Sequence, residues 1–130
     1  MSDFSNSLSV SASGLTAQSQ RLVHVSENIA NADTPGYRRK TVAFETAFRG
    51  ADTKGTVETG NVQLDRRELS RIYDPGHPLA DETGQYDGSN VDLMIEIADA
   101  REAQRSYEAN LKMFDQARQM SSRLMELLRR

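Results

Sequence analysis

Few residues of this chain could do chemistry, and their spacing fits none of the usual reactive sites. The two histidines, His24 and His77, are far apart, and neither has a Glu or His at the interval of a metal motif such as H-E-x-x-H. We interpret His24 as a helix-surface residue and His77 as a loop residue. The chain has no cysteine, which excludes disulfides, thiolate catalysis and cysteine-bound metals.

Acidic residues and methionines offer weaker signals. Residues 81–87 superficially resemble a calcium loop, but the D-x-D-x-D-G order and the Glu at its twelfth position are missing. A solvated acidic loop is therefore favoured over a cation site. The carboxylates of the C-terminal third would need a pocket to act as an acid–base pair, and we expect them on a solvated helix face. The set Met113, Met120 and Met125 is more typical of packing than of ligand binding.

No phosphate-binding glycine loop and no G-x-S-x-G elbow is present, so the sequence predicts no catalytic residue, no cofactor and no metal. The net charge of −3 gives no reason to expect nucleic acid as a partner. The basic runs Arg38-Arg39-Lys40 and Arg66-Arg67 lack an aromatic stacking platform, and we interpret both as solvated loops. No stretch approaches the roughly 20 apolar residues of a membrane helix. The first residues do not have the pattern of a cleaved secretory signal.

The elements that position these residues begin with a helix predicted over residues 4–32. Large apolar residues recur there every seven residues, and the alternate seam positions carry small residues that let another helix approach closely. Few charges occur in this stretch, which indicates burial on more than one side. The large residues are Leu8, Leu15, Leu22 and Ile29, and the small ones are Ala12, Ser19 and Ser26.

A small, irregular β insert is predicted over residues 37–88. The helix before it should end at Asp33-Thr34-Pro35-Gly36, because Pro-Gly suits the central positions of a type II turn. Segments rich in Thr, Val and Phe then predict short strands over 40–44, 55–64 and 69–73. Turn signals separate them at Arg49-Gly50, at residues 59–61, at residues 74–76 and at residues 83–84.

A second, long helix is predicted from residue 91 to the end, with Ser89 as its N-cap and Asp92 three residues later. It would be about 57 Å long, at about 1.5 Å per residue over roughly 38 residues. The chain therefore divides into residues 1–36, 37–88 and 89–130. With 37% hydrophobic residues its core must be thin, and the fold is mainly α, with the terminal helices packed together. The apolar stripe of the second helix contains Ile97, Ala100, Tyr107, Phe114, Ala117, Met120, Leu124 and Leu127.

Three segments resemble one protein family. Residues 26–37, S-E-N-I-A-N-A-D-T-P-G-Y, resemble the N-terminal signature of the flagellar rod and hook proteins. Residues 105–110, R-S-Y-E-A-N, are similar to the motif of that family's terminal helix. Residues 73–81, Y-D-P-G-H-P-L-A-D, followed by Gly84 and by N-V-D at 90–92, resemble its proximal-rod members. The end, Leu128-Arg129-Arg130, departs from the more neutral tail expected there.

The resemblance implies a structural subunit of the proximal rod of the bacterial flagellar basal body, not an enzyme. It implies a coiled-coil-like inner domain made by the terminal helices, copies that stack into a helical tube, and a β insert toward the outside of that tube. Such a tube transmits torque from the motor to the hook across the periplasm. The implied partners are further copies, the rod proteins FlgB, FlgF and FlgG, and FliE, after type III export without a cleaved signal.

The heptads alone would also allow a cytosolic helical adaptor or a flagellar export chaperone. The Thr-Pro-Gly-Tyr turn and the β insert argue against both, because a simple adaptor needs neither. Asn28 and Asn31 lie near the helix end, where their amides either bridge subunits or cap the helix. The expected assembly residues are Leu8, Ala12, Leu15, Ser19, Leu22, Asn28, Ile29, Asn31, Arg105, Tyr107, Asn110, Phe114, Met120, Leu124 and Leu127, and the turn residues are Thr34, Pro35, Gly36 and Tyr37.

Overall fold

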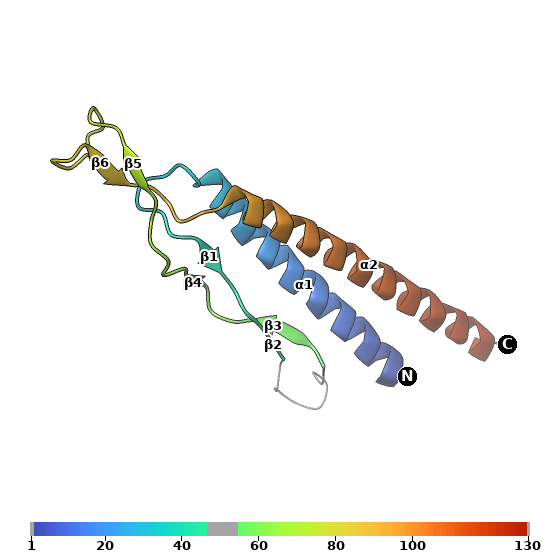
Figure 1. The fold of residues 1–130 in the computed structure, drawn as a ribbon. Coiled ribbons are helices and arrows are strands. Elements are labelled where there is room, and N and C mark those ends of the chain that lie inside the picture. Colours follow the sequence, from blue (N-terminus) through green and yellow to red (C-terminus); the bar gives the residue numbers. More distant parts are fainter. Residues whose placement is uncertain (1, 47–54, 130) are drawn as a thin grey trace.

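Two long helices lie side by side, with strands and loops along one side of the pair (Figure 1). The computed structural model describes residues 2–46 and 55–129. Helix α1 (Ser2–Ala30) and helix α2 (Leu93–Arg129) run antiparallel, so both ends of the chain lie at the same end of the pair. The prediction of a mainly helical fold with a small β insert between the two helices is confirmed.

The start of α2 differs from the prediction. Asp92 caps this helix: its Oδ1 accepts from the Met94 N–H at 3.0 Å, and its carbonyl accepts from the Glu96 N–H at 3.0 Å. Ser89 is not the N-cap, because α2 begins too far downstream for its hydroxyl to reach the first turn. That hydroxyl instead donates to the Ala32 carbonyl just beyond α1. The two helices are thus linked at the end where the chain turns.

The described part of the insert contains three antiparallel two-stranded ladders. Two of the predicted strands are each split into two. Residues 42–43 interrupt the strand predicted over 40–44, and residues 60–62 interrupt the one predicted over 55–64. At this break the Gly60 N–H donates to the Ala43 carbonyl at 2.8 Å. The strand at residues 85–87 was not predicted, and the Arg49-Gly50 turn signal lies outside the described residues. The ladders pair β1 (Lys40–Thr41) with β4 (Gln63–Leu64), β2 (Phe44–Thr46) with β3 (Val57–Thr59), and β5 (Arg71–Tyr73) with β6 (Gln85–Asp87).

The first two ladders follow one another along a single hairpin beside α1, and the third projects at the turn end of the helix pair (Figure 1). The pairing places Lys40 opposite Leu64 and Phe44 opposite Thr59. In the third ladder Arg71 lies opposite Asp87, and their side chains form an ion pair at 2.8 Å. The insert is therefore held mainly by backbone ladders and polar contacts.

The core is thin, as the composition predicts. Among the described residues, the only buried hydrophobic ones are Ala17, Val25, Ala103 and Ala117. The accessible surface is 9472 Å², whereas a compact monomer of this mass would expose about 6,900 Å². Within the described part of the chain, neither helix has an apolar stretch long enough to span a bilayer. Much apolar surface is thus left for contacts with other chains.

Candidate assembly site

The leucine row of α1 is not the most deeply buried part of that helix. The buried residues of α1 are instead Ser11, Ala17, Val25 and Asn28. The predicted row keeps part of its surface open. Its members Leu8, Ala12, Leu15 and Leu22 are half-buried, whereas Ser19 and Ile29 are exposed.

The seam between the helices consists of small and polar residues at seven-residue intervals on both helices. A Cβ at Gly14 would lie 2.9 Å from the side chain of Asn110, so the two backbones approach closely there. Two turns along, Arg21 reaches Asp99 at 3.5 Å and Glu102 at 3.4 Å. At the turn end, Asn28 donates to Glu96 at 3.3 Å. The facing rows are Gly14, Arg21 and Asn28 on α1 and Asn110, Ala103 and Glu96 on α2.

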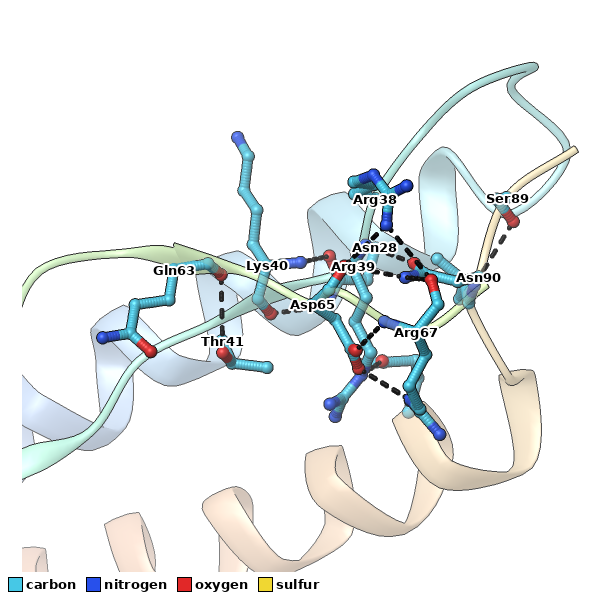
Figure 2. A network of polar contacts seen from close by, with 12 residues as sticks. Asn28, Arg38, Arg39, Lys40, Thr41, Gln63, Asp65, Arg67, Ser89 and Asn90 are labelled. Carbon is cyan, nitrogen blue, oxygen red and sulfur yellow. Dashed lines mark hydrogen bonds and ion pairs between the residues drawn. The ribbon is translucent and has the colours of Figure 1, made fainter. Parts of the chain in front are cut away.

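Asn28 ties the insert to α1. Its side chain is buried, and its amide pairs with the backbone of Lys40 as a neighbouring strand would. Oδ1 accepts from the Lys40 N–H at 2.9 Å, and Nδ2 donates to the Lys40 carbonyl at 3.0 Å (Figure 2). The Tyr37 hydroxyl donates to the same Oδ1 at 2.9 Å, and burial raises the pKa of Tyr37. The amide is thus fully used within one subunit.

Glu96 connects α2 to the same point. It is 0% exposed, and its carboxylate accepts from Nε of Arg39 as well as from Asn28. Nη2 of Arg39 lies 2.7 Å from Asp99, so one guanidinium bridges two carboxylates one turn apart on α2. We call Asn28, Tyr37, Arg39, Lys40, Glu96 and Asp99 the polar joint. It joins α1, the insert and α2.

The interpretation of residues 38–40 as a solvated loop is wrong. Arg39 belongs to the joint, and the Arg38 guanidinium donates to the carbonyls of Asp65 and Arg67 at 3.2 and 3.1 Å. Nζ of Lys40 lies 2.7 Å from Glu27. The hydrogen bond from Lys40 lowers the pKa of Glu27, and Glu27 in turn raises the pKa of Lys40.

Asn90, which belongs to the N-V-D segment at 90–92, makes a further set of polar contacts. Its Oδ1 accepts from the Arg39 N–H at 2.6 Å, and its Nδ2 donates to the carbonyls of Asp65 and Arg67 at 3.0 and 3.2 Å (Figure 2). Of the second basic run, Arg66 is exposed, as expected of a solvated loop, whereas Arg67 forms an ion pair with Asp65 at 2.8 Å. Asn90 therefore holds both sides of the insert just before α2 begins.

The turn after α1 has the geometry predicted for Thr34-Pro35-Gly36-Tyr37. Gly36 has φ +74°, and the Tyr37 N–H donates to the Thr34 carbonyl at 3.2 Å. Asn31 provides the cap, because its Nδ2 donates to the Glu27 carbonyl at 2.8 Å and its Oδ1 accepts from the Thr34 hydroxyl at 3.1 Å. The Gly36 N–H also donates to the carbonyl of Gly88 at 3.1 Å. These bonds fix the direction in which the chain enters the insert.

A cleft of about 290 Å³ lies beside the joint and is lined by Arg21, His24, Glu96 and Asp99 among others. This corrects two expectations. Glu96 and Asp99 face a pocket instead of a solvated helix face, and His24 is not a surface residue, because its side chain is only 20% exposed and lies 3.8 Å from Glu27. Each carboxylate that lines the cleft contacts a cationic side chain or a side-chain amide. These contacts hold the segments of the subunit together.

The β5–β6 hairpin keeps its acidic loop in a fixed shape. Oδ1 of Asp81 accepts from the Thr83 hydroxyl at 2.6 Å and from the Gln85 N–H at 3.1 Å, and Oδ2 lies 2.6 Å from Arg71. The Thr83 hydrogen bond, followed by the Gln85 bond and Arg71, lowers the pKa of Asp81. His77 stacks on Tyr86 with ring centroids 3.9 Å apart. No cluster among the described residues has the composition of a metal site.

The predicted assembly residues of α2 lie on several faces. Asn110 lies in the seam, Tyr107 and Phe114 are half-buried, and Arg105 is exposed. Met120, Leu124 and Leu127 are 48%, 43% and 66% exposed. The structure thus brings Asn28 and Asn110 into the seam and leaves the apolar residues near the end of α2 open. Their role in assembly stays a prediction.

Two protein families match the segments that build the seam and most of the joint. The family "Flagella basal body rod protein" matches residues 8–38, and the family "Flagellar basal body rod FlgEFG protein C-terminal" matches residues 83–127. The first segment includes most of α1 and the turn after it. The second includes β6, Asn90 and nearly all of α2.

Similarity to single proteins extends over nearly the whole chain. The flagellar basal-body rod protein FlgC of Agrobacterium fabrum is 43% identical, with 99% of this chain and 98% of the relative covered. FlgC of Escherichia coli O6:H1 is 34% identical, and FlgC of Bacillus subtilis strain 168 is 32% identical, each with 94% of this chain and 96% of the relative covered. The chain therefore belongs to the FlgC family of flagellar basal-body rod proteins, and it is a structural subunit of the rod and not an enzyme.

Proposed function

We propose that this subunit self-assembles with further copies in the proximal part of the rod, in a helical tube that carries torque from the motor to the hook. The observation that supports this most is the contrast between its interior and its sides. The polar joint holds three segments together, while large apolar side chains remain exposed along the helix pair. Such a subunit is held rigid by its internal contacts, and its surface is apolar where neighbouring subunits would contact it.

Transmission of torque requires subunits whose helices do not slide past one another. In the polar joint, a buried carboxylate and a buried amide are each bonded to two other segments, and leaving one of them without its partners would cost several kcal/mol. We propose that residues 1–36 and 89–130 form the inner domain of the tube. Residues 37–88 would lie on its outer side.

The proposed neighbours are other copies of the chain, the rod proteins FlgB, FlgF and FlgG, and FliE. The proposed place is the part of the rod that crosses the periplasm, reached through the flagellar type III apparatus without a cleaved signal. The absence of cysteine supports this route, because a chain that folds after export then needs no disulfide formation. The large accessible surface of the subunit is a reason to propose several neighbours, since a single partner would leave much of that surface exposed.

The decisive experiment places a charge on the leucine row. Leu15→Asp or Leu22→Asp, expressed in cells that lack their own copy of the gene, should remove swimming and keep the chain out of purified basal bodies, because a buried, unpaired carboxylate is costly. Circular dichroism of the purified variants checks that the helices persist.

Two matched variants serve as controls. Gln104→Asp adds the same charge to an exposed face of α2, and Arg66→Ala changes an exposed residue of the insert; both should swim normally. Normal swimming with Leu15→Asp and Leu22→Asp would show that the row faces solvent. Absence of the unaltered chain from basal bodies would overturn the proposed function itself.

A further inference from the structure

In the first two turns of α2 the usual burial pattern is inverted, with a charged side chain buried and apolar side chains exposed. Glu96 is buried, while Leu93, Met94, Ile95 and Ile97 are 48%, 77%, 38% and 45% exposed. Leu93, Met94 and Ile97 share one face of the helix, by their spacing of one and four residues. A group of apolar side chains at this level of exposure is typical of a contact surface.

The next turns of α2 show that this patch is local. The same outward face continues with Arg101, Glu108, Lys112 and Asp115, all of which are exposed. Charged residues of this kind are what a solvent-facing helix surface carries. The apolar residues that share one face at the start of α2 therefore mark a distinct surface, which we call the acceptor patch (Leu93, Met94 and Ile97).

The other end of α2 exposes a second apolar surface. Phe4 of α1 and Met120 of α2 line the same groove, and α1 begins two residues before Phe4, so residues 123–129 extend past the start of α1, by about 10 Å at 1.5 Å per residue (Figure 1). We call this segment the overhang. Its large apolar side chains are Leu124, Met125, Leu127 and Leu128, which are 43%, 47%, 66% and 80% exposed.

The charges at the two ends are complementary. Exposed carboxylates lie at the acceptor-patch end: Asp92 directly precedes the patch, and Asp33 follows Ala32, whose carbonyl accepts from Ser89. Exposed guanidiniums, Arg123 and Arg129, belong to the overhang and outnumber its one carboxylate, Glu126. None of these two aspartates and two arginines forms an ion pair with another described residue. The ends of α2 thus match each other both in apolar character and in charge.

We propose that the overhang of one copy docks on the acceptor patch of a second copy, so that subunits associate head to tail. This inference rests on the proposed function, self-assembly, and specifies the contact. Because the two surfaces differ, each added copy leaves one free overhang and one free patch. Such a contact between unlike surfaces does not close into a symmetric dimer, and it produces an open helical filament when successive copies do not close into a ring.

Disulfide trapping between two single-cysteine variants tests the contact, because the chain has no cysteine of its own. Full-length Met94→Cys is mixed with full-length Leu128→Cys under mild oxidation. Mixed dimers should clearly exceed both self-dimers. The control pair is Met94→Cys with Leu111→Cys, whose cysteine would lie at an exposed apolar position in the middle of α2.

Charge reversal gives a second, independent measurement. Arg123→Glu together with Arg129→Glu in the Leu128→Cys copy should reduce the mixed dimer about fivefold, as expected for two exposed ion pairs. Asp33→Arg in the Met94→Cys copy should recover part of the loss. A structural defect of the overhang would not be rescued by a change on the other copy.

Several results would overturn the proposal. Leu128→Cys pairing mainly with itself would indicate a symmetric dimer, and a Leu111 control as strong as the test pair would indicate non-specific association. Binding of the unmixed chain to phosphatidylglycerol vesicles without a mixed disulfide would assign the overhang to a membrane surface. If trapping fails while Leu22→Asp still blocks incorporation into basal bodies, this contact is wrong and the proposed function stands.

Discussion

The side-chain amide of Asn110 lies against the backbone of Gly14, where a Cβ would come within 2.9 Å of its Cγ, Oδ1 and Nδ2. The same amide donates to the Ser106 carbonyl at 3.0 Å, which keeps it folded along α2. A glycine inside a helix costs about 1 kcal/mol relative to alanine. Gly14 therefore gives α1 no local stability, and its contribution is the close approach of the two helices.

Gly14→Ala should change stability by an amount that depends on residue 110. With Asn110 present, the crowding should cancel or outweigh the gain in helix propensity; in an Asn110→Ala background the gain should appear in full. The effects of Gly14→Ala on the free energy of unfolding in the two backgrounds should differ by about 1–2 kcal/mol. This is within the range of interaction energies between contacting residues. Urea unfolding followed by circular dichroism measures it. Ser19→Ala, at an exposed site, should be additive with Asn110→Ala, whereas additivity for Gly14→Ala would show that the contact has no energetic weight.

Glu96→Ala should destabilise the subunit by about 3–5 kcal/mol, because Arg39 would stay largely buried without its main partner. Replacing the ion pair with apolar residues, as Arg39→Met with Glu96→Leu, should recover much of that loss. Glu102→Ala is the control, because its side chain is 68% exposed in a contact with Arg21 and should matter little. The free energy of unfolding in urea checks all three. A small effect of Glu96→Ala would mean that the joint does not hold the segments together.

The β5–β6 hairpin should loosen in acid. The folded pKa of Asp81 is lowered, chiefly by the Thr83 hydroxyl, whereas an unfolded aspartate has a pKa of about 3.9. Its bonds therefore stabilise the hairpin fully at neutral pH, and this stability is lost as the pH falls below about 4. Protection of the Gln85 amide against hydrogen exchange should decrease over that range. Asp81→Asn should remove the dependence and Glu82→Gln should keep it; a pH-independent protection in the unaltered chain would contradict this account.

Gly36→Val should impair the subunit more than Gly36→Asn. A Cβ at this position would meet no atom within 4 Å, so the cost comes only from the positive φ of 74°. Asparagine adopts that conformation with less strain than a β-branched residue does. Recovery of the chain in basal bodies, together with its thermal unfolding, measures the difference. If both variants behave alike, backbone geometry is not what this position contributes.

The sequence was sufficient to predict the elements whose signals are local. The heptad pattern indicated α1 to within two residues of each end, and Pro35-Gly36 predicted the turn with its positive φ. The short strands were harder to predict from the sequence, because β1 and β2 are separated by only two residues and their side chains are largely solvated. The β6 strand has no apolar alternation, and only its pairing with β5 defines it.

The seam and the joint could not be predicted because their members are polar. A heptad search finds the most apolar row, Leu8 to Ile29, but in a subunit with both internal and external contacts the internal row need not be the most apolar. Arg39 was interpreted as solvated since its partner Glu96 is 57 residues away in the sequence. One signal was present: Gly14, Arg21 and Asn28 also recur every seven residues, and Asn28 belongs to the motif that resembles the family.

The polar seam also specifies how far each helix may slide along the other. A seam made of leucines would pack nearly as well after one helix shifted by seven residues along the other, because leucine would again face leucine. Here the same slip would place Asn28 beside Ala103 and carry Glu96 past the end of α1, so the buried contact between Asn28 and Glu96 would be lost, at a cost of several kcal/mol. Single polar residues fix alignment in coiled coils in this way. A helix pair of this kind can thus reach one alignment and reject the shifted ones.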